Sequence, residues 1–174
     1  MNPKSYWDQV LEIIDRHGWA VQVVGSEPER SIPAYGYTIG LAARGLPDLL
    51  VFGLDFKTAN TILNNAARKM IAGAFEQRTG AVITEVASLP LKAQVLQPEQ
   101  FETFAMGARR HAMDTGAQVR VIQIILPDAH GLFPNEEGCD PKMIFMQDID
   151  AMVLRLQEDL PPSSKGKSSG PRRH

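Results

Sequence analysis

The stretch AYGYTIGLAARGLPDLLVFGL, residues 34–54, contains two strand patterns separated by a turn that holds glycine and proline. In the first pattern, Ala34 to Leu41, large side chains alternate with small ones, so that one face is large and the other almost bare. The second, Asp48 to Leu54, is apolar on both faces, which is typical of a central strand. The run WAVQVV, residues 19–24, is a third strand pattern, and three successive strands favour antiparallel pairing.

Helical periodicity and further strand patterns surround this segment. A helix begins after Asn2 or Ser5 and ends at Gly18, because both polar residues can cap a helix and glycine suits the position after its end. A second helix follows Asp55 and extends to Gly73. The remaining predicted elements are strands over 81–87 and 91–97, a helix from Pro98 to Gly116, strands over 119–127 and 143–146, and a final helix over 149–160. The order αβββαββαβ(β)α predicts an α+β fold with a mixed, largely antiparallel sheet and helices packed against it.

Composition divides the 174 residues into a single α+β domain, 1–160, and a basic tail, 161–174. The tail, PPSSKGKSSGPRRH, has no acidic and no large apolar side chain, which is typical of disorder. It holds four of the 18 basic residues and none of the 20 acidic ones, so the net charge of −2 becomes −6 for the domain. An acidic domain disfavours nucleic acid as a partner and suits a basic partner or none.

Secretion and membrane signals are absent from the sequence. Asp8, Glu12 and Asp15 interrupt the apolar core that a secretion signal needs, and no apolar run reaches the roughly eighteen residues of a membrane span. Cys139 is the only cysteine, so the chain cannot form an internal disulfide. These features predict a cytoplasmic protein that does not cross a membrane.

The bare face of the 34–41 strand is the first candidate site. Glycine inside a strand is typical of a close approach by backbone or ligand, so a ligand could lie flat on this face. The residues that would hold it are Tyr35, Tyr37, Thr38 and Gly40, with Thr38 as the hydrogen-bonding group. The alternative, which we favour, is that the helix over 56–72 packs against the small residues.

The loop from Asp128 to Asp140 is the second candidate site. It gathers the side chains of Asp128, His130, Glu136, Glu137, Cys139 and Asp140. A small hydrolase or thiol-dependent enzyme could use Cys139 with His130 and Asp128, because a reactive thiol needs a base and an orienting carboxylate. The spacing matches no metal-ligand pattern, and the sequence contains no phosphate-binding, dinucleotide-binding or nucleophile-elbow motif, so we predict no metal and no cofactor. A structural surface loop is the interpretation that we favour.

Four blocks of the sequence resemble one known family. They are GWAVQVV (18–24), YGYTIGLAARGLPDLLVFGL (35–54), ILNNAA (62–67) and QIILPDAHGLFPNEEGC (123–139). The family is the bacterial domain of unknown function 4262, and the resemblance covers roughly residues 18–140. This sequence departs from it at Asn135, where a tryptophan commonly follows the Phe-Pro pair, which questions any role for an aromatic side chain there.

A more distant resemblance leads to a prediction of function. The YTIGL block, the apolar strand after it and the asparagine-bearing helix are similar to suppressor-of-fused-like domains among bacterial toxin-immunity proteins, which implies a protein partner. We therefore predict a non-catalytic binding module for a protein partner or a small molecule, with the enzyme of the Asp128 to Asp140 loop as the alternative. The oligomeric state stays open.

Overall fold

A computed structural model describes residues 2–158 of the chain, so the predicted basic tail lies outside the described residues. The elements are α1 (Tyr6–His17), β1 (Ala20–Val24), β2 (Tyr35–Ile39), β3 (Asp48–Phe52), α2 (Phe56–Ile71), β4 (Val82–Ile83), β5 (Leu91–Val95), α3 (Pro98–Phe101), α4 (Met106–Thr115), β6 (Val121–Ile125), α5 (Pro141–Gln147) and α6 (Ile149–Glu158). None of these helices is long and apolar enough to cross a membrane.

The strands form one six-stranded sheet in the order β1-β2-β3-β6-β5-β4. All neighbours are antiparallel except β3 and β6, which run parallel with Asp48 opposite Val121. Each of the five residues of β3 is buried, as the pattern apolar on both faces predicts. The predicted α+β fold with a mixed, largely antiparallel sheet is confirmed.

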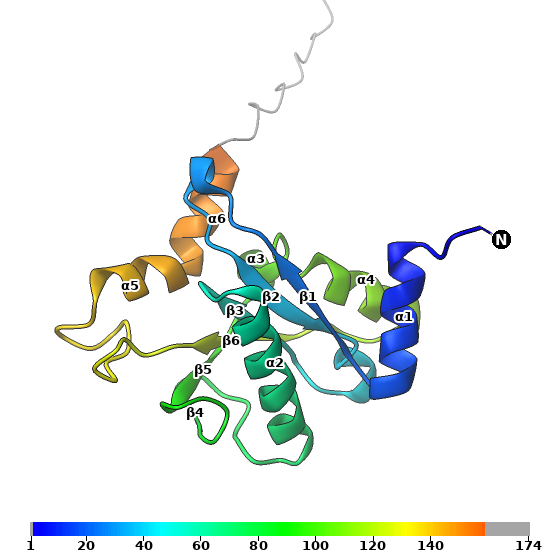
Figure 1. Ribbon diagram of the computed structural model, residues 1–174, viewed down its shortest axis with the longest axis horizontal. Coiled ribbons are helices and arrows are strands. Elements are labelled where there is room, and N and C mark those ends of the chain that lie inside the picture. The colour runs from blue at the N-terminus through cyan, green and yellow to red at the C-terminus, as the bar shows by residue number, and fades with distance from the viewer. Residues whose placement is uncertain (1, 159–174) are drawn as a thin grey trace, which may run out of the picture.

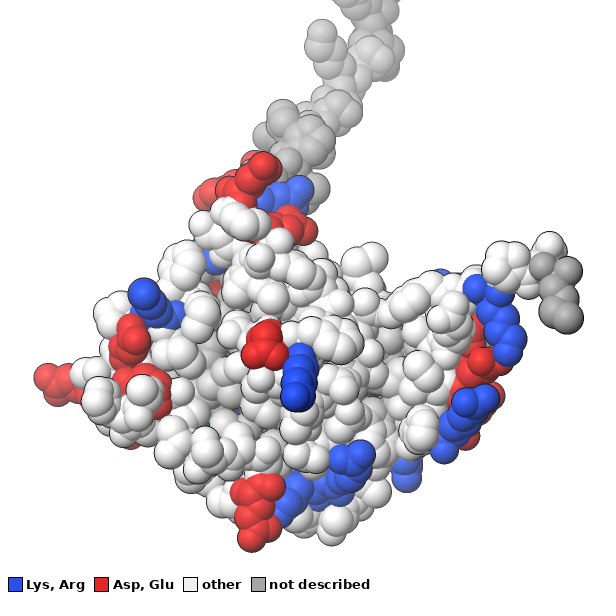
Figure 2. Space-filling view, viewed as in Figure 1, with Lys and Arg blue, Asp and Glu red and all other residues white. Residues whose placement is uncertain are grey.

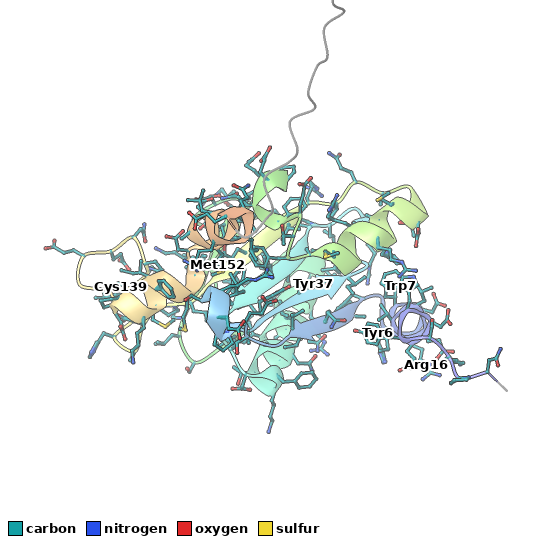
Figure 3. The ribbon with its side chains drawn as sticks, turned by 90° about the horizontal axis from the view of Figure 1, so that it is seen from above. Tyr6, Trp7, Arg16, Tyr37, Cys139 and Met152 are labelled. Atoms are coloured by element: carbon teal, nitrogen blue, oxygen red, sulfur yellow. The ribbon has the colours of Figure 1, made fainter. Side chains whose placement is uncertain are left out.

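The helices cover the two faces of this sheet unequally (Figure 1). On one face α2 is the main cover, with Met143 of α5 packed against the same core, which includes Leu49, Val51 and Ile122. On the other face α3, α4 and α6 cover a second core with Leu50 and Phe52 at its centre. Viewed from above, α2 and α4 lie on opposite sides of the strands, and α1 lies beside the edge strand β1 (Figure 3). α5 lies at the ends of the central strands β3 and β6.

The ends of the two longest helices form as their sequences predict. Ser5 caps α1, since its hydroxyl accepts a hydrogen bond from the Asp8 N–H while the Asp8 carboxylate accepts one from the Ser5 N–H. Gly18 then ends α1 in the left-handed conformation, at φ 91°. Asp55 caps α2 by accepting a hydrogen bond of 2.8 Å from the Thr58 N–H.

Three predicted elements differ from the structure. The strand over 143–146 is wrong: it is part of α5, because Asp140 caps a helix there and Pro141 suits its first turn. The predicted helix from Pro98 to Gly116 is two helices, separated where Ala105 leaves the helical conformation (φ −96°, ψ 47°). The strand over 81–87 shortens to the two residues of β4, and Glu85 beyond it has a positive φ of 61°, which ends an extended run.

Candidate functional site

The bare face of β2 is covered by helices. A Cβ atom on Gly36 would lie 3.0 Å from the Leu63 side chain of α2. A Cβ atom on Gly40 would lie 3.2 Å from Ile14 of α1, and Gly40 has φ +109°, which side chains rarely allow. The glycines therefore permit close helix packing, which favours the packing interpretation of this face over the ligand interpretation.

Thr38, the predicted polar contact on this face, bonds to a buried carboxylate. Its hydroxyl donates a hydrogen bond of 2.7 Å to Asp48 Oδ1 and accepts one of 2.9 Å from the Leu49 N–H. The Leu41 N–H also donates to Asp48 Oδ1, at 3.2 Å. Both polar side chains have no exposed surface, and burial raises the pKa of Asp48 to about 7. This pair ties the start of β3 to β2, and the sequence analysis did not single out Asp48.

The two tyrosines of β2 pack on the opposite face, toward α4. Tyr35 meets Phe104 edge to face with the ring centroids 5.2 Å apart, and burial raises its pKa to about 12. The Tyr37 hydroxyl accepts a hydrogen bond of 3.1 Å from the Gly107 N–H at the start of α4. Ligand binding by Tyr35, Tyr37, Thr38 and Gly40 stays a prediction. The packing leaves no open surface at Thr38 where a ligand could bind.

Asp128 organises the loop that the sequence singles out. Its Oδ1 accepts hydrogen bonds of 2.9 Å from the backbone N–H groups of His130 and Leu132, and its Oδ2 accepts one of 3.0 Å from the Asp140 N–H. These donors, above all those of Leu132 and Asp140, lower the pKa of Asp128. The Asp128 carboxylate thus joins the two ends of the loop, and both of its oxygens already accept hydrogen bonds from the backbone.

Cys139 lies beside Asp128, but His130 does not complete a catalytic set. The thiol is buried and its Sγ lies 3.4 Å from the carbonyl oxygen of Leu132. Burial, followed by the negative charges of Asp128 and Asp140, raises the pKa of Cys139, whereas a nucleophilic thiol needs a lowered one. Within residues 2–158, the exposed His130 imidazole makes no hydrogen bond to the thiol, so the geometry disfavours the thiol-dependent enzyme.

A pocket of about 360 Å³ lies next to this loop, and we call it the β5–α6 pocket. Its walls are Thr79, Gly80, Lys92, Ala93, Gln94, Ile125, Phe133, Pro134, Asn135, Ile144, Gln147, Asp148, Ile149 and Asp150. The Gln147 side chain fixes one wall, because its amide donates to the Leu126 carbonyl at 2.9 Å and accepts from the Leu126 N–H at 2.7 Å. A glutamine thus continues the hydrogen bonding at the end of β6 and holds α5 to the sheet.

Charged side chains of both signs meet in the β5–α6 pocket. The Lys92 ammonium lies 4.3 Å from the centroid of the Phe133 ring. Asp148 Oδ1 accepts a hydrogen bond of 3.1 Å from the Ala151 N–H, and Asp150 Oδ1 accepts one of 2.9 Å from Gln100. The sequence did not predict this pocket, because its lining residues come together from distant segments of the chain. Only Ile125, Phe133, Pro134 and Asn135 lie within one of the blocks that resemble the family.

Among the described residues, no group of three or more His, Cys, Asp or Glu is placed to hold a metal ion. No curated protein matches the chain, and no solved structure matches it. The sequence over residues 13–140 matches the family described as Domain of unknown function (DUF4262). Because that match covers most of the 174 residues, the chain belongs to this family.

Proposed function

We propose that the protein is a non-catalytic, cytoplasmic binding module that holds a small, partly apolar molecule in the β5–α6 pocket. The observation that carries this proposal is the pocket itself. Its volume of about 360 Å³ falls within the range of roughly 300 to 1,000 Å³ that is usual for ligand sites. Ile125, Phe133 and Ile149 supply apolar wall, and a few charged groups converge on it, which is the usual composition of such sites.

The charges of the pocket indicate the polarity of its ligand. Asp148 and Asp150 each use one carboxylate oxygen within residues 2–158, and the second oxygen of each makes no hydrogen bond there. Lys92 is the one basic side chain of the lining, and its ammonium already contacts the Phe133 ring. A ligand with an apolar body and a cationic group toward Asp148 and Asp150 therefore fits best.

Three aromatic probes of different charge test this proposal. We expect benzamidine to shift the backbone ¹H–¹⁵N NMR signals of residues 92–94, 133, 135 and 148–150. Benzyl alcohol should bind more weakly than benzamidine, and benzoate should bind most weakly. Asp148→Asn and Asp150→Asn should weaken the binding of benzamidine. Asp114→Asn, a change at an exposed position on α4, should leave that binding unaltered. Shifts confined to other surfaces, or no saturable shift with any probe, would refute the proposal, and a preference for benzoate would refute its charge assignment.

A protein partner is the second candidate, favoured by the outer surface of α1 and α4. Tyr6, Met106 and Met113 are 60%, 66% and 77% exposed there, and the Arg110 guanidinium lies 4.2 Å from the centroid of the Trp7 ring. Methionine, aromatic and arginine side chains are enriched in protein interfaces. If a protein partner binds this surface, Met113→Asp should abolish its capture while Asp148→Asn retains it, and the reverse result would exclude the surface.

A further inference from the structure

A second hollow, of about 540 Å³, lies between α1 and α2 with β1 as its floor, and we call it the α1–α2 groove. Its polar lining consists of Arg16, His17, Asn60, Asn64 and Arg68, beside the indole of Trp19. No aspartate or glutamate lines it, although acidic residues outnumber basic ones in the chain. Figure 2 shows basic side chains over the lower ends of α1 and α2 on this face.

A chain of hydrogen bonds fixes the direction of the two asparagine amides. Trp19 Nε1 donates a hydrogen bond of 2.9 Å to Asn64 Oδ1, and an indole nitrogen can only donate. Asn64 must therefore present its oxygen to Trp19 and its Nδ2 to Asn60 Oδ1, which lies at 3.4 Å. The Nδ2 of Asn60 then remains as a donor on the groove wall without a hydrogen-bond acceptor in residues 2–158.

The cations of the groove are largely unpaired. Arg16 makes no hydrogen bond and no ion pair within the described part of the chain, and Figure 3 shows it on the α2 side of α1, away from Trp7. Among the residues that the structure describes, the Arg68 side chain bonds only to the side-chain oxygen of Asn65, at 3.0 Å.

Helix dipoles do not neutralise this positive charge. Both helices end near the groove, and two helix C-termini contribute together about one negative charge. The two arginines carry two positive charges, which exceeds this negative charge by about one.

We propose that the α1–α2 groove binds the phosphate group of a small molecule. The guanidinium groups of Arg16 and Arg68 would hold its oxygens through charge-assisted hydrogen bonds, with Asn60 Nδ2 as a neutral donor. The groove has room beyond a phosphate, so the rest of the molecule would lie along Ile13 and Trp19. This site shares no lining residue with the β5–α6 pocket, so either proposal can fail without the other.

Tryptophan fluorescence can test the phosphate site directly, because the chain has two tryptophans and only Trp19 lines the groove. In a Trp7→Phe background at constant ionic strength, inorganic phosphate and pyrophosphate should change Trp19 fluorescence saturably, and citrate, a carboxylate anion, should bind more weakly. Arg16→Gln and Arg68→Gln should each lower the affinity for pyrophosphate about tenfold or more, which is usual when a hydrogen bond to a charged group is lost. Both positions are exposed, so the variants should keep the wild-type circular dichroism spectrum.

The matched control is Arg78→Gln, which removes an exposed arginine that pairs with Glu76 outside the groove. Its affinity for pyrophosphate should equal that of the background. An equal loss in Arg78→Gln, no saturable change with either phosphate, or unshifted side-chain amide NMR signals of Asn60 and Asn64 would overturn the proposal. Tighter binding of citrate would overturn the phosphate assignment, and an affinity for single-stranded oligonucleotides that rises with their length would overturn the small-molecule assignment.

Discussion

Replacing Asp48 by asparagine should remove a pH dependence of stability that the buried carboxyl group creates. Burial raises the pKa of Asp48 from 3.8 to about 7 in the folded protein, while the unfolded chain exposes the group to water. Between these two values the folded state binds more protons than the unfolded state, so the free energy of unfolding falls as pH rises. The shift of about three units corresponds to roughly 4 kcal/mol lost between about pH 4 and pH 7.

Urea unfolding from pH 4 to pH 8, followed by circular dichroism, measures this effect. The wild-type protein should lose stability across that range, whereas Asp48→Asn should be nearly flat, because an amide does not titrate. The slope is the quantity to compare, since the asparagine keeps an oxygen for the Thr38 and Leu41 donors but adds two N–H donors of its own. Equal slopes in the two proteins would refute the assignment of this pH dependence to Asp48.

Asp128→Asn is the matched control, because its carboxylate has a lowered pKa. The stability that this group contributes is present above its unfolded pKa and is lost as pH falls through its folded pKa. Removing Asp128 should therefore change the acid side of the curve and leave the fall from pH 5 to pH 7 in place. If Asp128→Asn flattened that fall, the effect would not be specific to Asp48.

Three further changes test the packing and the thiol. Gly36→Val should lower the free energy of unfolding by about 1 to 3 kcal/mol in urea titrations, because its side chain would press on Leu63; an unchanged midpoint would contradict the close approach of α2 to β2. Ser5→Ala should cost about 1 kcal/mol through loss of the helix cap, whereas the same change at the exposed Ser88 should be neutral. Cys139 should react with iodoacetamide at pH 8 more slowly than a free cysteine peptide, and fast labelling at neutral pH would revive the thiol-dependent enzyme.

Local patterns in the sequence predict most of the fold, because the periodicity and the end residues of a helix or strand reflect the contacts that this element makes. The alternation over Ala34 to Leu41 and the cap at Ser5 can be predicted without a structure, since each depends only on residues close together in the sequence. The apolar run over 143–146 was not, because a short run suits either a strand or a helix. The deciding signal was Asp140 and Pro141, a cap and a first-turn proline just before it.

The sites could be predicted only in part, because they depend on contacts between distant segments. The Asp128 to Asp140 loop is local in sequence, and the structure does bring Asp128 and Cys139 together. The β5–α6 pocket is not local, since it needs Lys92, Phe133 and Asp150 from separate elements. The bond between Trp19 and Asn64 also joins residues 45 apart, so no spacing rule could reveal it.

The blocks that resemble the family divide into those that build the fold and those that leave groups free for binding. In YGYTIGLAARGLPDLLVFGL, Gly36 admits α2, Gly40 admits α1, and Thr38 bonds to Asp48, so these residues are committed to packing. GWAVQVV and ILNNAA differ, because the bond from Trp19 to Asn64 leaves a donor on the wall of the α1–α2 groove. That donor is Nδ2 of Asn60, which lies just before ILNNAA on α2. A binding function is therefore better sought where these two blocks meet, beside Asn60, than on β2, whose side chains pack against helices.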